Sequence, residues 1–542
     1  MKKIILLYFL VAFFAACSDG FLDTESLTKK TNENFYKSPS DAQSALNAIY
    51  SEMAPYEVPQ FSFVTAELMS GDRLPGGGPD DAAALAIGQF TTNQNDMYLN
   101  AWSQNYAGIF RSNMLLESFA NITFDNAEQA NKVEGQVHFM RAYYFFDLAK
   151  QFGTAPLVLK TEKQNLPKAE VDELYAQIAS DLKVAIEKMP STAYSTDDIG
   201  KPTKWAAEGY MARVFLFYTG VYGKESLPLA EGGSISKQQV IDYVDDCIAH
   251  SGRVLVPDFR NLWPYSYSNV DYAYAKDNNL VWVGEEGGNT EALFSIRFSS
   301  LGNWTYLSAY NQMDLFFGWR NQDQIPFGQG WGWGPVNPNI YDKWPDTDLR
   351  KKASIIDVED ATEGISGYEW GADNQRHETG YWQKKYVPVN IKNSKGEPEN
   401  LSVTLYKAPT DFMLNNTQEI VLLRLADVML MGAELGSSKK QEYMDDVRFR
   451  ANMPSVPATL ENIKKERFYE LAFEGLHYYD LLRWGDAETE INKVTNIPVK
   501  NQNKAATYST KFRPETKGFL PIPESQIQLS DGVLKQNEGW NE

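Results

Sequence analysis

A long helix rich in aromatic residues constrains the fold of this 542-residue chain more than any other feature. The segment 127–152, AEQANKVEGQVHFMRAYYFFDLAKQF, has the periodicity of a helix, and Gly153 and Pro156 end it. Small residues such as Ala142 and Ala149 mark places where other helices can approach closely. The segment therefore predicts a scaffold of closely packed helices.

Helical periodicity recurs on both sides of this segment, with short breakers between the helices. In DAQSALNAIYSEM, for example, Ala42, Ala45, Leu46, Ile49 and Met53 form one helical face. The further predicted helices are 102–119, 171–189, 202–219, 237–250, 420–435, 440–450 and 460–482. Helices paired in this way predict repeat-like stacking, although no strict 34-residue period is present. The predicted class is mainly α.

The character of the sequence changes between residues 254 and 416. Gly, Pro, Asn and aromatic residues dominate there, and seven of the 13 tryptophans lie between Trp304 and Trp382. We predict loops with a few short strands, for example in EALFSIRF and LSVTLYK, and an extended stretch at 518–540. A single domain over 33–542 fits this pattern: a helical scaffold, about 33–253 and 417–542, interrupted by an irregular, loop-rich insertion.

The N-terminus has the pattern of an export signal. Lys2 and Lys3 precede an almost wholly apolar segment, 4–16, which is too short to span a bilayer as a helix. Small residues stand directly before Cys17, as in the lipobox of bacterial lipoprotein signals, although Phe14 occupies a position where Leu is more usual. We predict a signal peptide over 1–16, lipidation of Cys17, and a polar tether over 17–32.

The net charge argues against nucleic acid as a partner, and the cysteine content argues against an internal disulfide. The formal net charge is -20, whereas a phosphate backbone requires a basic surface, so nucleic acid is not an expected partner. Cys17 and Cys247 are the only cysteines, so acylation of Cys17 leaves no internal disulfide. Cys247 is predicted to be an inert thiol buried in a helix.

The sequence contains no pattern that requires catalysis. Glu466, Glu470 and Glu474 have i, i+4, i+8 spacing, which fits paired acid/base carboxylates but also ion pairs with arginines such as Arg424 and Arg483. The four histidines lack zinc-ligand spacing, and the Asp pairs 197/198 and 346/348 lack the calcium-loop pattern. GxSxG, P-loop and GxGxxG motifs are also missing. We expect no enzyme activity, metal or cofactor.

Five stretches, in order along the chain, resemble the SusD/RagB family of outer-membrane lipoproteins of Bacteroidota, the starch-utilization-system-D-like proteins. They are CSDGFLDTES, EGQVHFMRAYYFFDLAKQFGTAPLV, VLLRLADVMLMGAE, IKKERFYELAFEGLHYYDLLRWG and GFLPIPESQIQLSDGVLKQNEGW. One departure is visible, because His477 stands where the family usually has an arginine, in FEGLHYYD. That departure puts one structural ion pair in doubt.

The resemblance implies a tetratricopeptide-like helical fold and a lipid anchor in the outer membrane, facing the cell surface. It also implies a SusC-like TonB-dependent transporter as partner, which the protein covers as a lid. The expected cargo is an oligosaccharide or polysaccharide. Peptides or another nutrient fit the same architecture, as does an accessory of the transporter that binds nothing itself.

Sugars present apolar C–H faces between hydroxyl groups, so a glycan site needs flat aromatic rings beside fixed polar side chains on loops. Two regions have this composition. The predicted ligand contacts are Asp72, Arg73, Asn95 and Tyr98 in an early loop region, and Trp304, Tyr306, Trp319, Arg320, Trp331 and Trp333 in the insertion.

The insertion contains FGQGWGWGP, residues 327–335, in which glycines alternate with Trp331 and Trp333. Two interpretations remain open for this stretch. In an extended chain, both indoles would lie on one side, about 6.6 Å apart, and serve successive faces of a chain-like ligand. Alternatively, the glycines allow the loop to fold back, so that the indoles pack on the scaffold.

Overall fold

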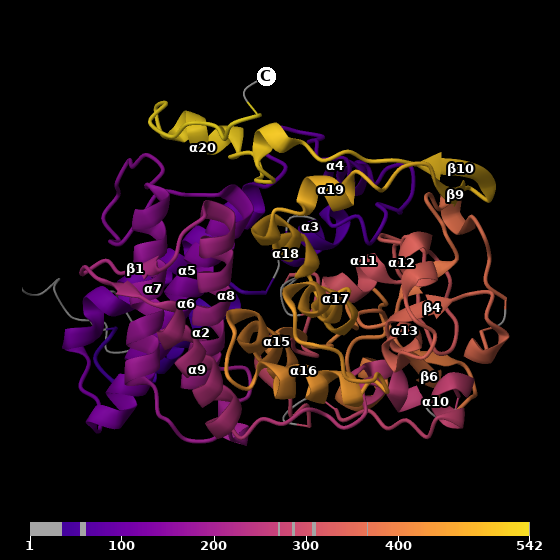
Figure 1. Ribbon diagram of the computed structural model, residues 1–542, viewed down its shortest axis with the longest axis horizontal. Coiled ribbons are helices and arrows are strands. Elements are labelled where there is room, and N and C mark those ends of the chain that lie inside the picture. Colours follow the sequence, from indigo (N-terminus) through magenta and orange to yellow (C-terminus); the bar gives the residue numbers. More distant parts are fainter. Residues whose placement is uncertain are drawn as a thin grey trace, which may run out of the picture.

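The computed structural model describes residues 35–54, 61–268, 271–284, 288–305, 310–365 and 367–540 (Figure 1). The signal peptide, Cys17 and the tether predicted for residues 1–32 lie outside the described residues. Helices dominate, and the few strands are short, so the protein is mainly α as predicted. Among the described residues, no helix has both the length and the apolar character needed to cross a membrane.

In the first half of the chain, the consecutive helices from α5 to α9 pack on each other and form one helical block (Figure 1). The long aromatic helix α6 has the bounds predicted from the sequence, and most of its residues from Val133 onward are buried. The helices of this half are α2 (Pro39–Ser51), α3 (Ser62–Met69), α4 (Ala82–Gly88), α5 (Leu99–Ser118), α6 (Ala127–Phe152), α7 (Val171–Lys188), α8 (Lys204–Tyr222) and α9 (Lys237–His250).

The C-terminal helices return to this block, since α15 packs on α8 and α9, and α18 packs on α8 and α3. Segments far apart in the sequence therefore share one hydrophobic core. The helices are α15 (Leu425–Leu435), α16 (Lys440–Phe449), α17 (Leu460–Leu471), α18 (His477–Trp484), α19 (Ala487–Ile491) and α20 (Glu524–Leu529).

The described part of the segment between these blocks contains loops, 3-10 turns and five short α-helices: α10 (Ala273–Asp277), α11 (Gln312–Phe317), α12 (Pro338–Lys343), α13 (Leu349–Ser354) and α14 (Leu401–Tyr406). The strands pair two by two, always antiparallel. The pairs are β1 (Leu227–Pro228) with β2 (Ser234–Ile235), β3 (Ala292–Ile296) with β8 (Ile420–Arg424), β4 (Ile355–Asp357) with β5 (Tyr381–Gln383), β6 (Asn390–Lys392) with β7 (Pro398–Asn400), and β9 (Ile497–Asn501) with β10 (Lys504–Tyr508).

Four local predictions were wrong. LSVTLYK forms the helix α14, because the Asn400 side chain accepts from the Ser402 amide and caps it. Residues 420–424 form strand β8, which pairs with β3, and the helix starts only at Leu425. The predicted helix 460–482 is broken between α17 and α18, where Phe473 and Gly475 have positive φ angles of 65° and 72°. The stretch 518–540, predicted as extended, contains the short helix α20.

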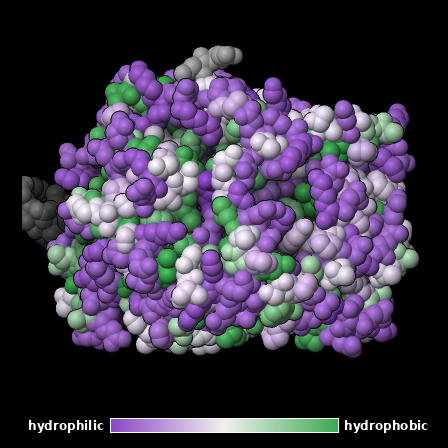
Figure 2. All heavy atoms as spheres, in the orientation of Figure 1, coloured by the Kyte–Doolittle hydropathy of each residue, from purple (hydrophilic) through white to green (hydrophobic). Residues whose placement is uncertain are grey.

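Hydrophilic side chains dominate the visible surface (Figure 2). On the face drawn in Figure 2, hydrophilic residues cover most of the area, and hydrophobic residues lie between them in small groups. Cys247 is fully buried on α9, as predicted, and burial raises the pKa of its thiol well above the ordinary value.

Candidate functional site

The early loop and the tryptophan-rich insertion, the two regions that contain the predicted ligand contacts, lie side by side. Backbone hydrogen bonds join residues 72–77 to residues 332–337, and we call this contact the loop seam. The amide of Gly77, for instance, donates to the carbonyl of Gly332 at 2.7 Å. Two isolated antiparallel bridges lie in the same seam. Two regions separated by more than 250 residues are therefore joined through one buried contact.

The stretch FGQGWGWGP folds back on its own protein. The amides of Trp331 and Trp333 donate to the carbonyls of Leu315 and Phe316, at the end of α11, at 2.7 and 2.8 Å. Both indoles meet the ring of Phe316 edge-on, with centroid distances of 4.7 and 4.6 Å. Trp333 is only 2% exposed, whereas Trp331 is half-buried. Ligand contact by the Trp333 indole therefore does not fit its burial, and Trp331 is the tryptophan of this stretch that reaches the surface.

The glycines make the fold-back possible. Gly332 and Gly334 have φ angles of 75° and 70°, a region that other residues rarely adopt, so the chain is not extended here. A Cβ atom on Gly332 would overlap the side-chain oxygen of Gln375, and one on Gly334 would lie 2.5 Å from Nη2 of Arg73. The close approach of the two loops thus depends on the missing side chains.

Arg73 holds the loop seam from inside. Its Nε donates to the carbonyl of Gly334 at 2.9 Å, its Nη1 lies 3.3 Å from Glu67, and its guanidinium stacks on Phe317 at 3.6 Å. Burial lowers the pKa of Arg73 to about 10, although Glu67 offsets part of that effect. Arg73 is 1% exposed. Its predicted ligand contact is therefore corrected to a structural role.

Arg320 is the predicted residue with the most suitable geometry for a polar ligand. Its Nη1 lies 3.2 Å from Asp81 and its Nη2 lies 3.0 Å from Asp373, and Nη1 also donates to the carbonyl of Trp331 at 3.0 Å. We call these four residues the Arg320 cluster. The side chain of Arg320 is 18% exposed, and that of Asp373 is 49% exposed. The cluster thus presents a fixed guanidinium, two carboxylates and a half-buried indole at the surface.

The remaining predicted contacts are placed differently. Tyr98 and Trp319 are each 2% exposed and belong to the hydrophobic core, so neither ring faces solvent. Asn95 is exposed on the loop before α5, and Trp304 is 59% exposed. Tyr306 lies outside the described residues. The predicted ligand contacts that remain as candidates are therefore the exposed or half-buried side chains: Asn95, Trp304, Arg320 and Trp331.

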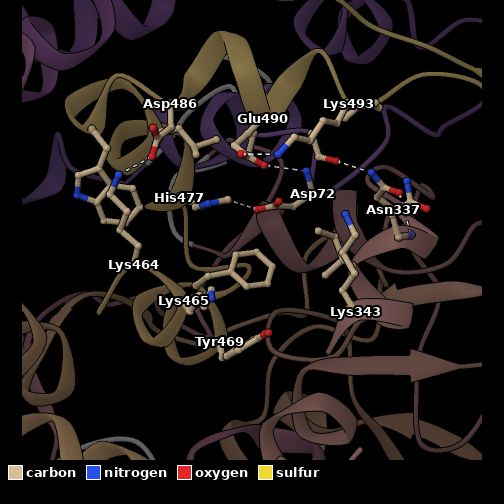
Figure 3. A pocket seen from close by; sticks show the side chains of 18 of the residues that line it. Asp72, Asn337, Lys343, Lys464, Lys465, Tyr469, His477, Asp486, Glu490 and Lys493 are labelled. Atoms are coloured by element: carbon tan, nitrogen blue, oxygen red, sulfur yellow. Dashed lines mark hydrogen bonds and ion pairs between the residues drawn. The ribbon is translucent and has the colours of Figure 1, made fainter. Parts of the chain in front are cut away.

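Asp72 does not join the Arg320 cluster; it lines a separate cavity of about 410 Å³ (Figure 3). Its Oδ2 lies 2.6 Å from Nδ1 of His477 at the start of α18. Burial disfavours a charge on His477, but the charge and hydrogen bond of Asp72 outweigh burial and raise the pKa of the imidazole. At the position of this departure, His477 therefore contacts the Asp72 carboxylate, and the two form an ion pair whenever the imidazole is protonated.

The three aligned glutamates belong to a buried ion-pair network. Glu470 binds Arg350 and Arg424, at 3.0 and 2.6 Å, and also pairs with Arg450. The predicted pairing with Arg424 is confirmed, whereas Arg483 pairs with Glu434 and Asp480 instead. Fully buried and neutralised carboxylates have no access to a substrate.

Sequence reasoning missed Asp81 and Asp373, which orient Arg320. Asp81 was visible in the polar loop SGDRLPGGGPDD, but its partner is 239 residues away in the chain. Pairings of this kind have no local signal. Among the described residues, no group of three His, Cys, Asp or Glu side chains is arranged to hold a metal ion.

Comparison with known proteins gives a consistent result over nearly the whole chain. A family model described as "Starch-binding associating with outer membrane" matches residues 20–216, and a model described as "SusD family" matches residues 290–540. The chain is 25% identical to SusD-like protein P2 of Formosa agariphila, over 97% of both chains.

Solved structures share the fold. A laminarin binding SusD-like protein is 26% identical, with a TM-score of 0.72 over 93% of this chain and 100% of that chain. Surface glycan-binding protein A from Bacteroides thetaiotaomicron, solved in complex with laminarihexaose, is 20% identical, with a TM-score of 0.71 over 92% of this chain and 100% of that chain. At that identity, the second structure supports the fold alone.

Proposed function

Because the chain belongs to the SusD family, we propose that it captures an oligosaccharide at the cell surface and delivers it to a SusC-like TonB-dependent transporter. The observation that carries this proposal is the likeness to the laminarin binding SusD-like protein, which extends over 93% of this chain. The protein acts by binding, and the chemistry on the captured glycan belongs to other proteins.

The Arg320 cluster is the proposed place of capture. A sugar ring can stack its C–H face on the half-buried indole of Trp331, while hydroxyl groups bind Asp81, Asp373 and the guanidinium of Arg320. Since Asp81 and Asp373 already fix the guanidinium, little side-chain entropy is lost on binding. Trp304 and Asn95, both exposed, are proposed as further contacts.

The lipid anchor at Cys17 accounts for the proposed location on the outer membrane. Three acyl chains, as bacterial lipoproteins carry, anchor a protein stably without any spanning helix. The transporter is proposed as the partner because of the family to which the chain belongs. Metabolic labelling with palmitate, with Cys17→Ala as control, tests the anchor. Co-purification from solubilised outer membranes tests the partner, and a protein that is recovered alone contradicts that part.

The binding experiment uses soluble protein that starts at Ser18. Affinity electrophoresis against a panel of polysaccharides selects a ligand, and calorimetry with its oligosaccharides measures affinity. Trp331→Ala, Trp304→Ala and Arg320→Gln are compared with the unaltered protein, and circular dichroism verifies folding. Loss of affinity in Trp331→Ala or Arg320→Gln supports the proposed site. Unchanged affinity in all variants contradicts the site, and a panel without any binding contradicts glycan capture. Peptide binding in its place identifies another cargo.

A further inference from the structure

The cavity beside Asp72 lies where the C-terminal helices meet the insertion, between α12, α17, α18 and α19 (Figure 3). Its volume of about 410 Å³ falls within the range of sites for small ligands. Neither Trp331 nor Arg320 lines it, so it is distinct from the Arg320 cluster. We propose that this cavity binds an acidic sugar unit, one that bears a carboxylate or sulfate group.

The apolar wall of the cavity consists of rings held in fixed orientations. Phe468 and Tyr469 lie on α17, and buried Trp344 packs behind both, with centroid distances of 5.9 and 5.1 Å. Phe468 also meets the His477 ring edge-on at 4.9 Å. Because these rings are already ordered, stacking a sugar on them costs little side-chain entropy.

Most charged side chains around the cavity already have partners. Lys464 pairs with Asp486 at 2.6 Å, Lys493 with Glu490 at 2.6 Å, Lys465 with Glu461 at 2.7 Å, and His477 with Asp72 at 2.6 Å. These four pairs leave no surplus carboxylate that would repel an anion. On a protein with a net charge of -20, such a neutralised surface differs from the average surroundings.

Three polar groups that line the cavity have no hydrogen-bond or ion-pair partner among the described residues: the ammonium of Lys343, the amide of Asn339 and the hydroxyl of Tyr469. Lys343 and Asn339 are four residues apart on α12, so they share one face of that helix. In Figure 3 the amine of Lys343 points towards the part of the cavity beside Asp72. Lys343 is thus the uncompensated cation, and the amide and hydroxyl are free to bind sugar hydroxyls.

These observations together select the ligand class. The rings fit the C–H face of a sugar, the free amide and hydroxyl fit its hydroxyl groups, and the free ammonium fits one anionic substituent. A neutral sugar would not use the charge of Lys343, which is exposed at the edge of the cavity. The inference rests on the proposed saccharide binding and adds to it a preference for acidic glycans at a second position.

The test compares tetragalacturonate with neutral laminarihexaose by calorimetry, using soluble protein that starts at Ser18. Lys343→Gln removes the positive charge and leaves a polar side chain that is one atom shorter. Lys395→Gln is the matched control, because Lys395 is an exposed lysine without an ion-pair partner in the described structure, in the turn between β6 and β7. Tyr469→Phe removes only the hydroxyl.

We expect Lys343→Gln to weaken tetragalacturonate binding by about three- to tenfold and to leave laminarihexaose binding unchanged. Binding of tetragalacturonate to the unaltered protein should weaken as the salt concentration rises. Lys395→Gln should resemble the unaltered protein, and Tyr469→Phe should show a smaller loss than Lys343→Gln.

Four outcomes overturn the inference. The first is equal tetragalacturonate binding by Lys343→Gln and Lys395→Gln, and the second is loss of that binding in Trp331→Ala but not in Lys343→Gln. The third is binding of tetraglutamate as tight as that of tetragalacturonate. The last is binding of laminarihexaose without binding of tetragalacturonate. The last outcome leaves the proposed function intact. Failure of every glycan in the panel contradicts the proposed function together with this inference.

Discussion

Nδ1 of His477 lies 2.6 Å from Oδ2 of Asp72, which joins the start of α18 to the loop after α3 across 405 residues of chain. Both side chains are largely buried. The pair fixes one wall of the cavity to the loop seam, so its protonation state affects both stability and the shape of the binding surface.

The first prediction concerns pH. The folded pKa of His477 is raised above its ordinary value of 6.5, so folding takes up a proton near neutral pH. The stabilising contribution is therefore complete below pH 6.5 and is lost as pH rises through the folded pKa. We expect the stability advantage over His477→Gln to be larger at about pH 6 than at about pH 8.5. Urea unfolding at both values measures this difference. The Asp72→Asn protein should lose the same pH dependence of stability. A pH dependence that persists in both variants contradicts its assignment to the His477–Asp72 pair.

The second prediction concerns the buried network around Glu470. Burial opposes its charge, but Arg450, Arg424 and Arg350 outweigh burial and hold the pKa of its carboxyl well below the ordinary value. Glu470→Gln removes the carboxylate that three buried guanidinium groups share and leaves a net positive charge in the interior, so we expect a loss of about 3–5 kcal/mol in the free energy of unfolding. The contribution of Glu470 is present above its unfolded pKa and is lost only in strong acid.

Glu461→Gln is the control for this measurement, because it removes an exposed carboxylate from the same helix, α17. Its pair with Lys465 lies in solvent, and such pairs contribute little to stability. Chemical denaturation of Glu470→Gln and Glu461→Gln measures how much each substitution lowers the free energy of unfolding. Similar losses in the two proteins would show that the buried network is not a principal source of stability.

The third prediction distinguishes the two indoles of FGQGWGWGP. Trp333 is buried, so Trp333→Ala should lower the free energy of unfolding by about 3–5 kcal/mol. Trp331 is half-buried, and Trp331→Ala should cost less stability but weaken glycan binding by about three- to tenfold. Denaturation and calorimetry on the same two proteins provide the measurements. A Trp331→Ala protein that binds normally would remove this indole from the site.

The fourth prediction concerns the close approach within the loop seam. Gly332→Ala adds a methyl group that overlaps the side-chain oxygen of Gln375, at a φ angle of 75°. Gly396→Ala is the matched control, because its φ angle is also positive, 82°, but no atom lies within 4 Å of the added Cβ. Both variants carry the cost of the backbone conformation, of order 1 kcal/mol. We expect a clearly lower melting temperature for Gly332→Ala than for Gly396→Ala. Equal melting temperatures would mean that the seam accommodates the added methyl group.

The periodic parts of the fold were predictable from the sequence, because helix bounds depend on local spacing and local breakers. The long helix α6 has the predicted bounds for this reason, since Asn126 and Gly153 cap its two ends. The break between α17 and α18 and the strand β8 were missed. Strand β8 depends on its partner β3, more than 100 residues earlier, and an apolar run alone does not distinguish a buried strand from a helix.

For the candidate site, the sequence by itself determined the family resemblance and the composition of the two loop regions, whereas their contact appears only in the structure. Only the tertiary structure decided which side chains remain available. It buried Trp333, Arg73, Tyr98 and Trp319, left Arg320 at the surface, and placed Asp72 against His477 in another cavity. The physical reason is that exposure depends on contacts between distant segments, whereas the spacing of residues along the chain records only local geometry.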